Sequence, residues 1–283
     1  MRPAGRTNYV WTEGTRPVVS PRFDPDIAHP ARVYSVWIGG KDHYPADRQA
    51  AEEVAACRPH VVAGARANRA FLARMVRYLA GQRGIRQFLD IGPGLPAPGS
   101  THEVAQAIAP ESRVVYADND PLVLAHARAL LTSTREGECD YLDGDLREPD
   151  KILAEAARTL DFTQPAAVIL VAVLHFLPDS DDPQGIVAAL ASALAPGSFV
   201  VISHLTADFA PDEVASGVAA YNALVPAGIT ARTHREVTAL FGGLALVPPG
   251  VVPVSEWRPD HAPARGVNAD VYAALATITG WSR

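Results

Sequence analysis

The stretch that decides the fold is residues 88–94, which read Phe-Leu-Asp-Ile-Gly-Pro-Gly. It is a short apolar run that leads through an acid, Asp90, to two glycines, Gly92 and Gly94. Glycine tolerates positive φ and has no Cβ, and a helix that begins just after such a turn presents free backbone N–H groups. The stretch therefore predicts the first strand-to-helix turn of a nucleoside-binding sheet, with Asp90, Gly92 and Gly94 at the ligand.

The sequence after residue 84 alternates short apolar runs with helical patterns, which is typical of a parallel sheet built from βα units. Residues 244–247 and 251–254 flank a Pro-Pro-Gly turn and predict a hairpin. We therefore predict an α/β fold with a doubly wound, mostly parallel seven-stranded sheet that ends in an antiparallel C-terminal hairpin. Strands are expected over residues 87–91, 113–118, 140–142, 167–173 and 198–203.

The N-terminal part of the chain has a different texture. Residues 1–22 mix Pro, Gly, Thr and Arg without periodicity and predict a flexible tail. Residues 23–84 predict a helical extension, with helices over 31–38, 46–56 and 61–80. Residues 85–283 are then expected to form the Rossmann-like, nucleoside-binding domain.

Composition excludes several classes of protein. With 48% hydrophobic and 20% charged residues, the 283-residue chain is a globular and not a disordered sequence. The longest apolar run, residues 166–174, is far shorter than the roughly 20 residues needed to cross a bilayer. The cysteines Cys57 and Cys139 have no metal-ligand spacing. We expect a cytoplasmic protein with no membrane partner and no metal.

The charge is unevenly distributed. Residues 1–88 carry 14 Arg and Lys against 7 Asp and Glu, whereas residues 89–283 carry 11 against 24. Either the basic extension docks on the acidic core, or it attracts an anionic substrate. No basic run is interleaved with aromatic residues, so we expect no nucleic-acid partner.

The choice of nucleoside cofactor rests on the acids. Asp118, followed by Asn119, ends the second predicted strand, where a carboxylate can accept both hydroxyls of a ribose. Residues 92–97 also fit a relaxed dinucleotide fingerprint, but prolines crowd this loop and remove N–H groups that a pyrophosphate needs. Asp90 would repel a diphosphate, and it suits a cationic amino-acid group. Asp145 and Leu146, after the third strand, suit an adenine. These features favour S-adenosylmethionine (SAM) and the class I SAM-methyltransferase fold.

Two histidines are candidates for the chemistry. His175 follows the fourth predicted strand and His204 ends the fifth, both at the ligand-binding edge. Each is either a general base or a hydrogen-bonded scaffold residue. Methyl transfer from a sulfonium needs mainly alignment and exclusion of water, so a dedicated base is not obligatory.

Several motifs resemble a bacterial family of SAM-dependent methyltransferases first catalogued as a domain of unknown function. The resemblance covers about residues 28–260 and implies a class I fold with SAM as cofactor. Its most specific part is the Gly-Gly-Lys-Asp segment at residues 39–42. The motifs are residues 31–44, 66–71, 88–94, 115–121, 173–179 and 257–259.

The extension then resembles a lid over the cofactor. Tyr34 and Trp37 would cover it, and Gly39 and Gly40 would let the chain turn across it, with Gly40, Lys41 and Asp42 at the ligand. The alternative is a helix that packs only for stability. Asn68 and Arg69 would bind the methionine carboxylate. For Arg69, an ordinary position on the protein surface is an equally good interpretation. We therefore add Tyr34, Gly40, Lys41, Asp42, Asn68 and Arg69 to the candidate cofactor contacts.

The leading hypothesis is a methyltransferase that acts on an O or N atom of a small metabolite. The alternatives are an NAD(P)-dependent oxidoreductase and a SAM-binding protein without catalysis. The sequence leaves the acceptor and the oligomeric state open.

Overall fold

The computed structural model describes residues 24–130, 132–260 and 269–279. The predicted tail, residues 1–22, lies outside the described residues.

A sheet of eight strands forms the centre of the molecule, in the order β3-β2-β1-β4-β5-β8-β6, with β7 paired to β8. Strands β1 to β5 are parallel, and β6, β7 and β8 are antiparallel additions. The strands are β1 Gln87–Ile91, β2 Arg113–Asp118, β3 Glu138–Asp143, β4 Ala167–Val171, β5 Phe199–Leu205, β6 Ala245–Leu246, β7 Val252–Pro253 and β8 Val271–Thr277.

The mostly parallel sheet with an antiparallel C-terminal end confirms the predicted fold class, but two details differ. The sheet has eight strands and not seven, and β6 and β7 do not form a hairpin with each other. Each pairs with β8 instead, Ala245 opposite Thr277 and Val252 opposite Ala273. Strand β8 was not predicted. Most of its residues are buried, so its sequence does not alternate apolar and polar side chains.

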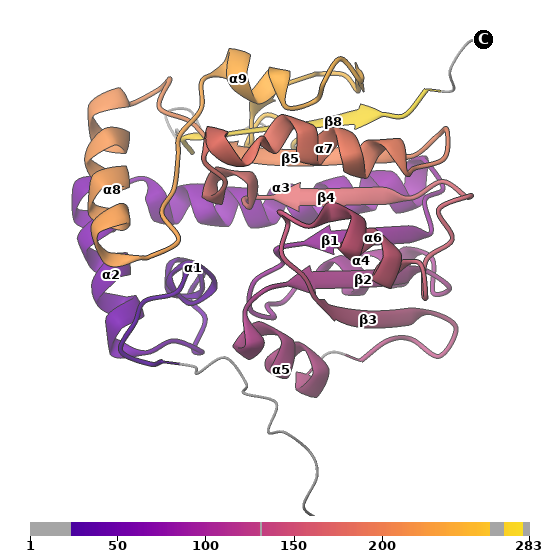
Figure 1. The fold of residues 1–283 in the computed structure, drawn as a ribbon, viewed down its shortest axis with the longest axis horizontal. Helices are drawn as coiled ribbons and strands as arrows, with labels where there is room; N and C mark the ends of the chain where they lie inside the picture. The colour runs from indigo at the N-terminus through magenta and orange to yellow at the C-terminus, as the bar shows by residue number, and fades with distance from the viewer. Residues whose placement is uncertain (1–23, 131, 261–268, 280–283) are drawn as a thin grey trace, which may run out of the picture.

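Helices cover both faces of the sheet because its strands alternate their apolar side chains between two cores. Phe88 and Val114 pack with α3 and α4, whereas their neighbours Leu89 and Val115 pack with α6, α7 and α9. Figure 1 shows α7 in front of the strands and α3 behind them. The helices are α1 Pro30–Ile38, α2 Pro45–Cys57, α3 Val61–Gln82, α4 Thr101–Ile108, α5 Pro121–Leu130, α6 Pro149–Ala156, α7 Pro183–Ser192, α8 Pro211–Leu224 and α9 His234–Ala239.

A third apolar cluster forms a cap beyond the carboxyl ends of the parallel strands. Helices α1 and α2 meet α8 there, through Val33, Ala51, Val54 and Tyr221. In Figure 1 these helices lie on the left, where the arrowheads of β1 and β4 point. The predicted extension therefore packs on a helix, α8, that lies more than 150 residues later in the chain.

Helix α3 connects the cap to the sheet. Its first turns, from Val61 to Asn68, face the cap, and its later residues Phe71, Met75 and Leu79 are buried against the sheet. Within the described residues, no helix combines the length and the apolar character needed to cross a bilayer.

Candidate active site

A cavity of about 510 Å³ lies between the cap and the carboxyl ends of the parallel strands. This is the edge at which open α/β sheets bind ligands, and small-molecule sites typically measure about 300–1,000 Å³. Most of the residues predicted for the site line it. They are Tyr34, Asn68, Arg69, Asp90, Gly92, Gly94, Asp118, Asn119, Asp145, Leu146 and His175.

Asp90 presents a buried carboxyl group in the wall of this cavity. The residue is only 4% exposed, and its Oδ2 accepts a hydrogen bond of 2.6 Å from Thr101 Oγ1. Burial raises the pKa of Asp90 to about 6, although the Thr101 hydrogen bond and the charge of Arg69 oppose the rise. A cation brought close to Asp90 would restore the ionised form.

Asp118 lies at the end of β2 and holds the neighbouring turn. Its Oδ2 accepts from the Gly94 N–H at 3.2 Å, and its Oδ1 accepts from the Asp120 N–H at 3.0 Å. Burial raises the pKa of Asp118 to about 6, against these two backbone hydrogen bonds. Each carboxylate oxygen has a second lone pair, so both can still accept from a ligand hydroxyl.

Gly92 lets the turn after β1 pass close to the loop after β4. Its φ is 71°, and an added Cβ would lie 2.5 Å from Val173 Cγ2. A side chain there would be strained and would also displace the loop that carries His175. The sequence prediction of a glycine-dependent turn therefore has a direct steric reason.

The loop after β3 completes the acidic side of the cavity. Asp145 accepts a hydrogen bond from the Arg147 backbone N–H at 2.9 Å, and Leu146 is 6% exposed. Asn119 is exposed at the rim. Asp90, Asp118 and Asp145 thus line one cavity, as three neighbouring strand ends predicted.

A chain of hydrogen bonds ties α1 to the sheet through α3. Ser203 Oγ donates to Asn68 Oδ1 at 2.7 Å, Asn68 Nδ2 donates to Tyr34 Oη at 3.2 Å, and Tyr34 Oη donates to the Ala65 carbonyl at 2.9 Å. Arg69 extends beside this chain and contacts the Ala97 carbonyl at 3.3 Å. The side chains of α1 are therefore held over the cavity by specific polar contacts.

Gly40, Lys41 and Asp42 do not line the cavity. Gly39 takes φ 83° and ends α1, and the Gly40 N–H donates back to the Ser35 carbonyl at 2.8 Å. The chain then turns outward, so Lys41 and Asp42 are exposed, and Asp42 lies 3.8 Å from His126. The segment that the sequence placed across the cofactor instead caps a helix.

His175 follows β4 in the short helix η1, Leu174–Phe176, and faces the cavity. Its Nδ1 is shut off from solvent and has no hydrogen-bond partner among the described residues. Burial, followed by the nearby His204, Arg58 and Arg232, holds the pKa of His175 well below its ordinary value. The ring is therefore neutral at physiological pH, which leaves one nitrogen able to accept a proton or a hydrogen bond.

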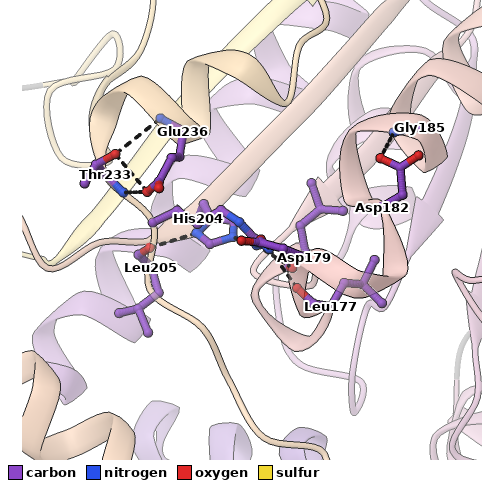
Figure 2. A network of polar contacts seen from close by, with 10 residues as sticks. Leu177, Asp179, Asp182, Gly185, His204, Leu205, Thr233 and Glu236 are labelled. Atoms are coloured by element: carbon purple, nitrogen blue, oxygen red, sulfur yellow. Dashed lines mark hydrogen bonds and ion pairs between the residues drawn. The ribbon is translucent and has the colours of Figure 1, made fainter.

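His204 does not reach the cavity. It is fully buried, its Nδ1–H donates to the Leu205 carbonyl at 2.7 Å, and Arg232 donates to its Nε2 at 2.8 Å. Figure 2 shows this ring between Leu205 and the loop of Leu177 and Asp179. Burial lowers the pKa of His204 to about 4. Of the two readings left open by the sequence, the contacts of His204 match the scaffold residue.

Comparison with known proteins decides the family. The family model described as S-adenosyl methyltransferase matches residues 17–279. The chain belongs to this family. The resemblance found in the sequence is thereby confirmed, and SAM is the cofactor of this methyltransferase. The oxidoreductase alternative is set aside.

Two solved structures are similar to this methyltransferase along most of its length. A DUF574 family protein from Streptomyces avermitilis MA-4680 is 45% identical, with a TM-score of 0.87, and the match covers 90% of this chain and 99% of that chain. A protein from Thermobifida fusca YX is 38% identical, with a TM-score of 0.83, and the match covers 90% and 96% of the two chains. No protein with a curated description matches.

Sequence reasoning missed the part of the methyltransferase cavity beyond His175. Arg58, Gly217 and Tyr221 line it, from the end of α2 and from α8. Arg58 is 7% exposed and forms an ion pair with Asp270, its Nε lying 3.1 Å from Asp270 Oδ2. The excess of arginine in the first 88 residues was the only signal, and it identified no particular residue.

Proposed function

We propose that this methyltransferase transfers the methyl group of SAM to an O or N atom of a small metabolite. The observation that carries the proposal is the extent of the cavity, which continues from the three aspartates past His175 to a space under α8. When bound, SAM supplies a methyl group on a positively charged sulfur; the acceptor lone pair takes it as the C–S bond breaks. A cavity that continues beyond the cofactor residues favours a second ligand, and therefore catalysis, over mere SAM binding.

The residues suited to hold SAM follow the chemistry of its parts. Both oxygens of Asp118 can accept ribose hydroxyls, and Asp90 offers negative charge to the ammonium group. Asp145 can accept from the adenine amino group, beside the apolar Leu146. In this proposal Arg69 and Asn68, which both line the cavity, bind the methionine carboxylate. The proposed cofactor contacts also include Gly92, Gly94, Asn119 and Tyr34.

The described part of the extension, with α8, acts in this proposal as a cover that excludes water from the transfer. Trp37 lines the cavity, and its Nε1–H donates to the Ala51 carbonyl at 3.1 Å, which joins α1 to α2. The same helices pack on Tyr221 of α8. The cover thus has its own apolar core and a defined position.

In this proposal the ring of His175 accepts a hydrogen bond from the O–H or N–H group of the molecule that is methylated. Its neutral ring fits that role, because a cationic imidazole has no free lone pair. A polar atom that is buried without a partner is uncommon in native proteins and costs about 1–3 kcal/mol, so its presence beside a ligand cavity supports a functional position.

The experiment that tests the function is transfer of label from methyl-labelled SAM into a bacterial extract, split into small molecules and macromolecules. We expect label in the small-molecule fraction, bonded to O or N by mass spectrometry and NMR. His175→Ala should lower the transfer rate about tenfold, the value of one neutral hydrogen bond, with SAM affinity unchanged. Label on carbon, in protein or in nucleic acid would overturn the proposed acceptor class.

The affinity for SAM should depend on pH through Asp90 and Asp118. Both have a pKa of about 6 in the free protein, because burial favours their neutral forms. SAM needs the charged forms, so binding expels protons below pH 6 and the affinity falls as the pH falls. For each group that must ionise, the loss is about tenfold per pH unit. Calorimetry between pH 5 and pH 8 measures it.

A control for this pH dependence is Asp143→Asn, which removes an exposed carboxylate at the end of β3 that does not line the cavity. That variant should keep the full dependence, whereas Asp90→Asn should reduce its slope. An affinity that stays flat through pH 6 would contradict the assignment of these carboxylates to the cofactor.

A further inference from the structure

The cavity has two chemically different halves along the sheet. In the strand order β3-β2-β1-β4-β5-β8, the aspartates lie at the carboxyl ends of the first three strands, and His175 follows β4. The other half lies at β5, at the start of the antiparallel β8, and under α8. We call this half the acceptor chamber. Its apolar lining includes Val54, Val61, Phe176, Leu205, Tyr221 and Val271.

Among the residues that the structure describes, one charged group faces the acceptor chamber, the guanidinium of Arg58. The residue follows α2 and is 7% exposed, and its Nε–H donates to Asp270 Oδ2 at 3.1 Å. Asp270, just before β8, is fully buried. A guanidinium carries five N–H donors, and Asp270 is its only hydrogen-bond partner among the described residues. Both Nη groups are therefore available to a ligand in the chamber.

The surrounding structure keeps Arg58 in this position. Gly217 of α8 lies against its stem, because an added Cβ would be 3.0 Å from Arg58 Cβ and 3.3 Å from Arg58 Cδ. The Arg58 backbone N–H donates to the Val54 carbonyl at 2.8 Å. The guanidinium is thus fixed by a glycine, a buried carboxylate and the end of α2. Such fixing suits recognition of a second planar group.

Arg58 and Arg69 serve different halves of the cavity. Arg69 is close enough to Asp90 and Tyr34 to shift the pKa of both, whereas Arg58 is close enough to His175 to lower the pKa of that ring. The cofactor half thus has its own arginine for the methionine carboxylate. Arg58 is left for the other ligand.

We propose that Arg58 binds a carboxylate of the methyl acceptor through its two Nη groups, so that the acceptor is a small organic acid with an apolar or aromatic body. The inference rests on the proposed function and names its substrate class. A carboxylate fits the planar fork in bidentate fashion. The ion pair with Asp270 already balances the charge of Arg58, so any further buried anion adds an excess of negative charge. A monoanion adds less of this excess than a phosphate does, which favours a carboxylate over a phosphate.

The test is calorimetry on the protein saturated with S-adenosylhomocysteine. The probes are benzoate, phenylacetate and hexanoate, each compared with its uncharged amide, together with inorganic phosphate. We expect at least one acid to bind about 10- to 100-fold more tightly than its amide, the value of a charged hydrogen-bonded pair. Phosphate should bind more weakly than that acid. If no acid binds the wild-type protein more tightly than its amide, the proposal is wrong. This comparison needs no variant.

Variants then assign the preference to Arg58. Arg58→Lys keeps a charge beside Asp270 but loses the fork, and should reduce the preference for the acid about tenfold. Arg58→Met should abolish it. Arg66→Met, an exposed arginine of α3 outside the cavity, should leave it unchanged. A preference that survives Arg58→Met would overturn the assignment.

The two proposals fail in different ways. If Arg58 instead binds the cofactor carboxylate, both Arg58 variants will weaken binding of S-adenosylhomocysteine itself, and the proposal about the acceptor falls. If the proposed function fails, the extract experiment shows label on carbon or in macromolecules, whatever the calorimetry gives. Labelled products that are O- or N-methylated but carry no acid group would refute only the inference about Arg58.

Discussion

Asp118→Ala is expected to weaken SAM binding about 1,000-fold, because two hydrogen bonds to a charged acceptor contribute about 1.5–3 kcal/mol each. The carboxylate is 7% exposed and faces the cavity. The substitution removes both proposed ribose contacts and also the acceptor for the Gly94 N–H, which holds the turn after β1. Titration calorimetry with SAM measures the loss.

The matched control is Asp143→Ala. Asp143 is opposite Asp118 in the register of β2 and β3, but its side chain is exposed and does not line the cavity. The Asp143→Ala protein should bind SAM as tightly as the wild type does. Thermal melting of both free proteins separates loss of binding from loss of folding. An Asp118→Ala protein that melts normally and binds SAM within tenfold of wild type would refute the ribose assignment.

The site residues that lie at the carboxyl ends of strands could be predicted from the local sequence. Asp90 and Asp118 stand at the ends of buried apolar runs, and parallel strands bring such ends to one edge. Gly92 was predicted for its backbone freedom, and its φ of 71° agrees. These positions follow from periodicity and turn chemistry, which are encoded within a few residues.

The acceptor chamber depends on contacts that local sequence does not encode. Arg58 meets Gly217 and Asp270, which lie more than 150 residues away along the chain. No spacing rule relates α2 to α8. His204 shows a different limit, because its place at the end of β5 was right, but the pleat directs its ring to Arg232 and away from the cavity.

Arg232→Met is expected to destabilise the protein by about 3 kcal/mol or more, because three buried acceptors lose their donor at about 1–3 kcal/mol each. Arg232 is 5% exposed. Its guanidinium donates to the Leu174 carbonyl at 3.2 Å, to the Leu177 carbonyl at 2.9 Å and to His204 Nε2 at 2.8 Å. It also pairs with Asp179 at 2.6 Å. Methionine fills similar space but leaves two carbonyls and a histidine nitrogen without their donor.

The effect should concentrate on the loop that carries His175, because Arg232 bonds both ends of η1. Urea unfolding measures the free energy, and hydrogen exchange should show faster exchange over residues 174–181. Arg235→Met is the control: this exposed arginine lies three residues along the chain, and its loss should change stability by no more than about 0.5 kcal/mol. Equal stability of the two variants would mean that Arg232 does not hold the loop. If instead Arg232→Met slows methyl transfer more than it weakens SAM binding, the network of Arg232 and His204 acts by positioning His175.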